Sequence, residues 1–284
     1  MTETQNPFLT AYHTPHETVP FHLIRLEHYE PAILKGMEEQ NREIETIVNN
    51  PEEPTFQNTI VALERSGDLL NRVSTVFGNL LSAETNDEMD ALAEKVMPML
   101  TEHSNNITLN EALFARIHKV YASDHSTLSV EENRLLENTY QSFIRSGANL
   151  AEKDKETFRQ ISASLSLNSL KFSQNLLKEN NGYELVLTEE QLTGLPDSAI
   201  EAYAQTAKEK GKEGYVVTLS IPSFGPFMKY STHRELRKEL YTAYHTQCTH
   251  DNEYNNLDIV KTLVNLRQQR AQLLGAPTVA DFVL

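Results

Sequence analysis

The sequence predicts a mainly α-helical protein with one small β insert. Along most of the 284 residues, apolar side chains recur three and four positions apart, with charged side chains on the opposite face. Many of these stretches begin at a residue that can cap a helix or end near glycine or proline. Only two short stretches depart from this period, because they are rich in β-branched and aromatic residues.

The first half of the chain is expected to form an extended lead-in followed by helices. Residues 1–26 carry three prolines and form the predicted lead-in. The helices predicted after it span approximately residues 27–48, 56–82, 87–104 and 110–121. Gly67 lies in the apolar stripe of the second helix, where a missing side chain would let a neighbouring helix approach closely. Pro98 predicts a kink in the third helix.

Two capping motifs organise the second half. Ser129 and Glu132 have the spacing of a capping box and predict a helix through Gly147. Thr232 and Glu235 have the same spacing and predict a helix to about Thr246. Further helices are predicted at about residues 152–179, 197–210 and 257–274. Residues 180–182 end the first of these, and residues 275–277 end the last.

Residues 183–187 and 215–220 are predicted as two short strands, because both are rich in valine, leucine and tyrosine and are bounded by glycine or proline. The helix between them allows either parallel or antiparallel pairing. The sequence has no internal repeat and no long linker, so residues 27–284 are expected to form one helical region with this sheet as an insert.

The last residues predict the beginning of another helix. Thr278 is a good N-cap residue three positions before Asp281, and Phe282 begins a new apolar pattern. We expect a first helical turn that the end of the chain cuts short; a frayed tail is the alternative.

Composition excludes several classes of protein. The chain has 25 Lys and Arg against 40 Asp and Glu, a net charge of −15, which argues against a nucleic-acid partner. No stretch approaches 18 apolar residues, so no membrane partner is expected, and the N-terminus lacks the pattern of a signal peptide. The single cysteine, Cys248, excludes a disulfide framework and fits a reducing compartment. We therefore expect a cytoplasmic protein.

No metal site is predicted in this sequence. A helical zinc-peptidase motif places histidines at i and i+4 with a glutamate between them, but His16-Glu17 is followed by Pro20 at the second histidine position. Two looser groups of possible ligands remain: His13, His16 and His22, and His245, Cys248 and His250. Both are interpreted as chance groupings of ordinary residues, with chelation as the alternative for each.

Other catalytic motifs are also missing. The sequence contains no Gly-x-Ser-x-Gly elbow, no Ser-x-x-Lys and no glycine-rich nucleotide loop. Cys248 could act as a nucleophile only with a distant histidine as its base. The tyrosines at 230, 241, 244 and 254 could line a peptide groove or belong to an ordinary core. We therefore assign no catalytic, cofactor-binding or metal-binding residue to this chain.

Several blocks in a fixed order extend over essentially the whole chain. They are Phe56–Leu70, Val76–Leu80, Ser82–Asn86, Leu165–Leu177, Leu219–Ser223, Tyr230–Ser231, Arg234–Tyr244, Leu263–Arg267 and Leu273–Gly275. These blocks resemble the N-terminal region of the thimet oligopeptidase family of zinc metallopeptidases. The resemblance is greatest to bacterial peptidyl-dipeptidases, followed by oligopeptidase A-like enzymes.

The resemblance implies a helical ellipsoid that cleaves short peptides inside a deep channel. In this family a His-Glu-x-x-His helix and a downstream glutamate hold zinc in the C-terminal half, and none of these residues is present here. The resemblance thus implies that this chain forms a channel wall, with the C-terminal catalytic half as its partner, and is inactive alone. The alternative is a non-catalytic helical scaffold or adaptor.

Overall fold

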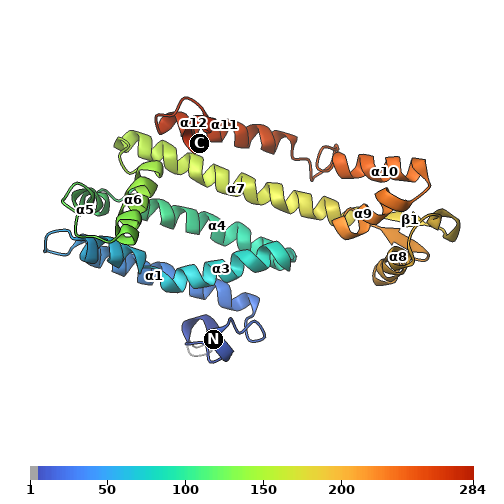
Figure 1. Ribbon diagram of the computed structural model, residues 1–284, viewed down its shortest axis with the longest axis horizontal. Coiled ribbons are helices and arrows are strands. Elements are labelled where there is room, and N and C mark those ends of the chain that lie inside the picture. The colour runs from blue at the N-terminus through green and yellow to red at the C-terminus, as the bar shows by residue number, and fades with distance from the viewer. Residues whose placement is uncertain (1–5) are drawn as a thin grey trace. The chain divides into compact units, whose positions relative to one another are not determined.

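The computed structural model describes residues 6–284, and it confirms the predicted mainly helical fold with a small sheet (Figure 1). The chain divides into two compact units. Unit 1 contains the residues up to Leu167 together with Leu266–Leu284, and unit 2 contains Asn168–Asn265. Two helices, α7 (Glu152–Gly182) and α11 (Leu257–Leu273), contribute residues to both units.

Unit 1 is built from helices packed on helices. The lead-in contains short 3₁₀ turns at Pro7–Leu9, Pro15–Glu17 and Leu26–His28. The following elements are α1 (Tyr29–Val48), a π-helical turn (Phe56–Val61), α2 (Ala62–Glu64), α3 (Asp68–Ala83), α4 (Asp87–Thr108), α5 (Glu111–Tyr121), α6 (Val130–Arg145) and, at the end of the chain, α12 (Val279–Val283).

Helices α1 and α3 pack closely because a glycine lies at their contact. A Cβ atom placed on Gly36 of α1 would lie 2.8 Å from the Cα atom of Leu70 in α3. Real Cβ atoms do not approach backbone atoms so closely, so any side chain at this position would push the helices apart. Phe8 of the lead-in covers one end of the pair, and its ring centroid lies 5.2 Å from that of Tyr29.

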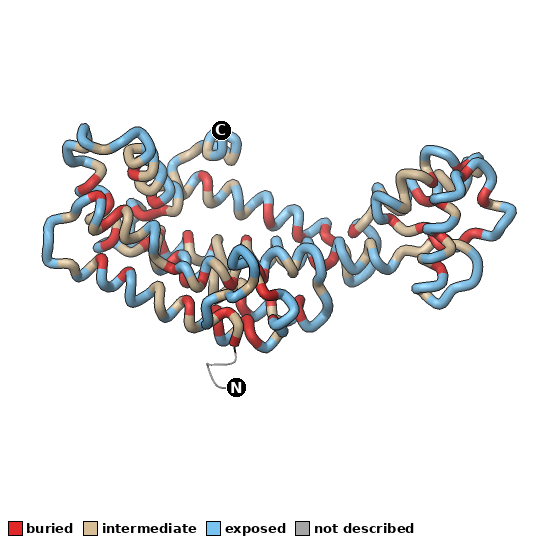
Figure 2. The backbone as a smooth tube through the Cα atoms, turned by 60° about the horizontal axis from the view of Figure 1, so that its bottom comes forward, coloured by how far each residue is buried: buried red, intermediate tan, exposed pale blue. Residues whose placement is uncertain are grey.

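A second apolar cluster joins α1, the π-helical turn, α5 and α6. Its larger buried members are Ile44, Ile47, Phe56, Ile60, Leu113, Ile117, Val120, Leu136 and Phe143. Figure 2 shows that buried positions alternate with exposed ones along the helices of the chain, as expected for amphipathic helices with one face in a core.

The predicted helix over residues 56–82 is wrong as a single element. Residues 56–61 form a π-helical turn, and the chain changes direction at Gly67, whose φ of +75° is left-handed. Such a φ is accessible mainly to glycine, so Gly67 interrupts the helix and precedes α3. The missing side chain does permit a close approach, because a Cβ at Gly67 would lie 2.3 Å from Nε2 of Gln40.

Unit 2 contains the small sheet. Strands β1 (Leu185–Leu187) and β2 (Tyr215–Val217) pair antiparallel, with Val186 opposite Val216. The strand prediction is confirmed, although both strands are shorter than expected. Helices α8 (Asp197–Glu209), α9 (Ile221–Tyr230) and α10 (Arg234–His245) pack with the strands around the buried side chains Leu187, Tyr203, Val217, Leu219, Phe227 and Leu240.

In unit 2 one helix is absent from the predictions and one capping prediction is wrong. No element is predicted over Ile221–Tyr230, which forms α9; its Pro222 occupies the first turn, where the missing N–H costs nothing. Thr232 does not form the predicted capping box with Glu235. His233 is the N-cap of α10, and Thr232 instead donates a hydrogen bond from Oγ1 to the carbonyl oxygen of Thr193, at 3.1 Å.

Other local predictions are confirmed in unit 1. Glu132 donates its backbone N–H to Oγ of Ser129 at 3.2 Å, and Ser129 donates its own to Oε2 of Glu132 at 2.9 Å, which completes the capping box. Asp281 donates its backbone N–H to Oγ1 of Thr278, so the predicted turn is present as α12. Helix α4 continues through Pro98 to Thr108, four residues beyond its predicted end.

Candidate functional site: a cleft between α1 and α3

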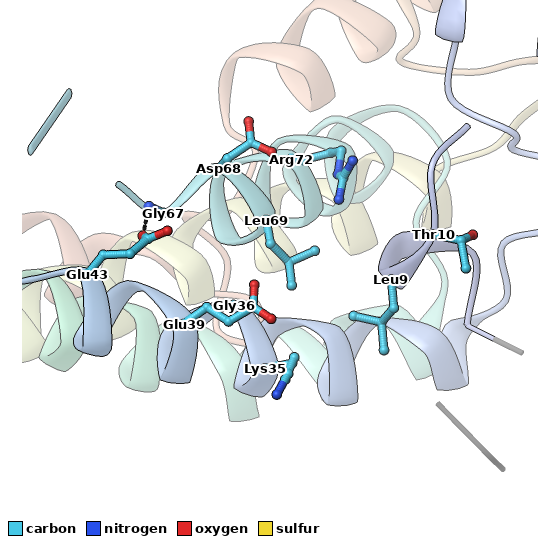
Figure 3. A pocket seen from close by; sticks show the side chains of 10 residues that line it. All are labelled: Leu9, Thr10, Lys35, Gly36, Glu39, Glu43, Gly67, Asp68, Leu69 and Arg72. Atoms are coloured by element: carbon cyan, nitrogen blue, oxygen red, sulfur yellow. Dashed lines mark hydrogen bonds between the residues drawn. The ribbon is translucent and has the colours of Figure 1, made fainter. Parts of the chain in front are cut away.

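A cleft of about 460 Å³ lies between α1 and α3 in unit 1 (Figure 3). This volume is within the range of sites that bind small molecules. Its lining residues are Leu9, Thr10, Lys35, Gly36, Glu39, Glu43, Gly67, Asp68, Leu69 and Arg72. Five of these side chains are charged, and leucines supply the apolar part of the wall.

The helical period brings the charged residues together. Lys35, Glu39 and Glu43 are four positions apart, so they lie along one face of α1. Leu69 and Arg72 are three positions apart on the first turns of α3. The close packing at Gly36 places these two faces along the same cleft.

Glu43 fixes the start of α3. The backbone N–H of Gly67 donates to Oε2 of Glu43 at 2.7 Å, drawn as the dashed line in Figure 3. A carboxylate is favourable here because the first N–H groups of a helix have no partners within the helix and carry partial positive charge. This helix terminus is therefore already occupied by a side chain of the protein itself.

Arg72 connects α3 to the lead-in. Its Nη2 donates to the carbonyl oxygen of Phe8 at 3.0 Å, and its guanidinium lies 5.2 Å from the ring centroid of Tyr12. Burial raises the pKa of Tyr12, and the charge of Arg72 partly opposes this shift. Among the described residues, Nη2 is the only guanidinium nitrogen of Arg72 with a hydrogen-bond acceptor, so the side chain keeps unused donors.

Glu39 is the partly buried acid of the cleft without a partner: within residues 6–284 its carboxylate takes part in no hydrogen bond and no ion pair. Asp68 is likewise without a partner among these residues, but it is exposed. Lys35, one turn earlier, is paired with Glu38 at 3.2 Å. Figure 3 shows the Glu39 carboxylate directed toward the space between the helices, with the Leu69 side chain between it and Arg72. The cleft thus contains a carboxylate without a partner, that of Glu39, and a guanidinium group, that of Arg72, with hydrogen-bond donors that have no acceptor.

A neighbouring polar cavity of about 860 Å³ also has Gly67 and Asp68 in its wall. Within it, Nε2 of His103 lies 2.7 Å from Oε1 of Gln40. Burial lowers the pKa of His103, which favours the neutral ring. Ser66 donates its hydroxyl to the carbonyl oxygen of Leu63 rather than to the histidine, so no serine nucleophile is formed here.

The histidine-containing groups discounted from the sequence are only partly brought together. His13 and His22 line a cavity of about 360 Å³ in the lead-in, but His16 does not. The ring of His245 stacks on Tyr241 at 3.9 Å, and Nε2 of His250 lies 3.4 Å from Oε1 of Glu179. Across the part of the chain that the structure describes, no three histidine, cysteine, aspartate or glutamate side chains converge as a metal site.

Cys248 is a poor candidate for a nucleophile. Its side chain is buried, and burial together with the nearby charge of Glu179 raises the pKa of the thiol. A raised pKa lowers the fraction of the reactive thiolate at neutral pH.

The sequence did not reveal Glu39 and Arg72 as candidate binding residues. Each is one of many charged residues on a predicted helix, and only the packing of α1 against α3 brings them to one cleft. The one available signal was glycine at Gly36 within a helical stripe, which indicates close helix packing but not what lies beside it.

The chain is similar to known peptidases over nearly its full length. It is 36% identical over 277 residues to Dipeptidyl carboxypeptidase of Escherichia coli, a match that covers 96% of this chain. It is 32% identical to Oligopeptidase A of Haemophilus influenzae over 98% of its length, and 28% identical to Probable cytosolic oligopeptidase A of Arabidopsis thaliana over 99%. The model of Peptidase family M3 matches residues 227–284.

These matches confirm the family resemblance predicted from the sequence. The chain spans about 41% of the length of the first two of these relatives and 40% of the third. No helix among residues 6–284 has both the length and the apolar character that a membrane span requires.

Proposed function

Because this chain is a relative of the enzymes of peptidase family M3, we propose that it is part of a zinc-dependent oligopeptidase of the peptidyl-dipeptidase type. The observation that carries this proposal is the 36% identity to a dipeptidyl carboxypeptidase over 96% of the chain. The whole enzyme acts on short peptides, and this chain supplies a wall of the channel in which they are cleaved.

An exposed apolar face in unit 2 supports the role of a wall that packs against further protein. On α11, Leu257, Val260 and Val264 follow one another at helical spacing and are 48%, 43% and 58% exposed. The buried side chains Ile259 and Leu263 lie between them in the sequence. A helix with apolar residues on more than its buried face is typical of one that another element covers.

Among residues 6–284, no group of side chains fits a catalytic zinc ion. Such a site needs three protein ligands in fixed geometry and an open position for water. Of the histidines singled out in the sequence, His13 and His22 line one cavity without His16, and His250 is paired with Glu179. We propose that the zinc of the whole enzyme is held by other residues, and we assign no catalytic step to the residues described here.

Two preparations test the proposal: the product of the whole reading frame and residues 1–284 alone. We expect the whole product to release C-terminal dipeptides from an N-acetylated hexapeptide, and a zinc chelator to stop the reaction. We expect residues 1–284 alone to cleave nothing and to retain no stoichiometric zinc after dialysis. Mass spectrometry of the products separates dipeptide release from internal cleavage, and metal analysis reports the zinc content.

Contrary outcomes are equally specific. A reading frame that encodes no His-Glu-x-x-His, with no peptide cleavage by its product, would favour the non-catalytic scaffold. Chelator-sensitive cleavage by residues 1–284 alone would show that a metal site had been missed. A cytoplasmic location is part of the proposal, supported by the single cysteine and by the relative named as cytosolic.

A further inference from the structure

We infer that the cleft between α1 and α3 binds a short peptide with free termini, its ammonium group on Glu39 and its carboxylate on Arg72. The charges of the cleft and their placement on two helices point to this ligand, independently of the proposed peptidase activity. It assigns a ligand to a site of unit 1 for which the comparisons with known proteins provide none.

Glu39 provides the carboxylate for the ammonium group of the ligand. Glu39 is partly buried without an ion pair or hydrogen bond among the described residues, although Lys35 and Arg72 line the same cleft. A partly buried carboxylate without a partner is unfavourable, so a cation that reached it would be bound. Glu43 adds a second carboxylate, of which only Oε2 is engaged by Gly67.

Arg72 provides the cation for the carboxylate of the ligand. Its contacts with Phe8 and Tyr12 hold the guanidinium in place, and among the described residues Nη1 has no acceptor, while the unpaired Nε is buried. Arginine binds carboxylates well because its planar fork matches the two oxygens. A pre-positioned arginine loses little side-chain entropy when an acid binds to it.

The placement of Glu39 and Arg72 on two helices favours a peptide over a single amino acid. In the view of Figure 3 the Leu69 side chain lies between Glu39 and Arg72, and Leu9 also lines the cleft. In a free amino acid one carbon atom joins the ammonium and carboxylate groups. In a dipeptide or tripeptide at least one peptide unit separates them, and Leu69 and Leu9 can then contact the side chains of the ligand.

Calorimetric titration of residues 1–284 with glycyl-leucine tests this inference. We expect saturable binding of the dipeptide. N-acetylglycyl-leucine lacks the ammonium group and glycyl-leucine amide lacks the carboxylate, so each should bind at least about tenfold more weakly. Leucine alone should bind more weakly than the dipeptide. Titration with glycyl-glycyl-leucine then shows which length of peptide the cleft prefers.

Variants identify the groups that bind each terminus. Glu39→Gln should weaken glycyl-leucine about tenfold but leave the acetylated peptide unaffected, since that ligand has no ammonium group to lose. Glu45→Gln, an exposed acid on α1 outside the cleft, is the matched control and should bind like the original chain. Arg72→Lys keeps the charge but loses the fork, and should weaken binding in the same way as the amide ligand.

Three outcomes would overturn the inference. These are the absence of saturable binding, equal affinity for the acetylated and free dipeptides, and equal effects of Glu39→Gln and Glu45→Gln. Circular dichroism of each variant separates lost binding from lost folding. Because the titration uses a chain for which we propose no cleavage, the result is independent of whether the whole protein is a peptidase.

Discussion

Different contacts stabilise the interior of each of the two units. In unit 1, α1 and α3 approach closely because Gly36 has no side chain, and apolar side chains fill the remaining core. In unit 2, hydrogen bonds of Asn256 connect it to α7. Nδ2 of Asn175 donates to Oδ1 of Asn256 at 2.9 Å, and Nδ2 of Asn256 donates to the carbonyl oxygen of Phe172 at 3.0 Å. Both asparagine side chains are buried.

Helix packing thus depends on a missing side chain in unit 1, at Gly36, and on buried amide groups in unit 2, at Asn175 and Asn256. A glycine contact in unit 1 tolerates no added atoms, whereas a buried amide in unit 2 tolerates no removed ones. The comparison predicts opposite sensitivities, which substitutions in each unit can test.

The largest effect is expected at Gly36. Gly36→Val places side-chain atoms against the backbone of Leu70 and should lower the free energy of unfolding by about 3 kcal/mol. Gly78→Val is the matched control, because a Cβ at this glycine of α3 meets nothing within 4 Å. Chemical denaturation measures both, and hydrogen exchange should show lost protection in α1 and α3. Equal effects at the two glycines would mean that the close packing is not structurally important.

A smaller effect is expected at Asn256. Asn256→Ala leaves the buried side-chain amide of Asn175 without its acceptor and should cost about 2 kcal/mol. Asn181→Ala, at an exposed position near the end of α7, provides the comparison and should change stability by less than about 0.5 kcal/mol. Hydrogen exchange should show the loss in unit 2, in contrast to Gly36→Val. Loss of protection in unit 1 alone would contradict the proposed division of roles.

Helix capping gives a third comparison between the units. Ser129→Ala removes a complete capping box from α6 and should cost about 1 kcal/mol. Thr232→Ala should cost about 0.5 kcal/mol, since Thr232 makes one exposed hydrogen bond to Thr193 and does not cap α10. Denaturation midpoints measure the two losses. A larger loss at Thr232 than at Ser129 would mean that the contact with Thr193 stabilises unit 2 more than we infer.

These two residues also show what the sequence could and could not predict. The pattern Ser/Thr-x-x-Glu is the same at Ser129 and Thr232, but only the first forms the box, because Thr193 competes for the hydroxyl of Thr232. Such competition depends on a residue 39 positions away and cannot be seen in a local motif. The fold class and most helices were predicted because periodicity is local.

Glycine and proline account for the other differences. Gly67 was interpreted as part of one helix, and its left-handed φ instead separates two. Helix α9 contains two prolines: Pro222 lies in the first turn, where proline is tolerated, and Pro226 lies inside the helix. The cleft was not predictable at all, because Glu39 and Arg72 belong to different helices whose pairing no local pattern specifies.

The smallest effect is a pH dependence that is specific to unit 1. His103 in α4 is buried beside Gln40, and burial lowers its pKa from the ordinary value of 6.5. In the unfolded chain the ring takes up a proton as the pH falls through 6.5, while in the folded chain it stays neutral until a lower pH. The unfolded state therefore binds more protons in that interval, so the stabilisation from neutral His103 is complete above pH 6.5 and declines below it.

We expect His103→Gln to remove this decline, since glutamine does not titrate. The measurement is the free energy of unfolding at several pH values between 5 and 8, with the curve of His103→Gln subtracted from that of the original chain to cancel the contribution of the carboxylates. The difference should be constant above pH 6.5 and should decline on acidification below it, because burial lowers the pKa of His103 in the folded chain. His22→Gln, an exposed histidine of the lead-in, is the control and should leave the original decline in place. A decline of the same size in His103→Gln would assign it to groups other than His103, and the buried contact between His103 and Gln40 would then have no part in the acid response of unit 1.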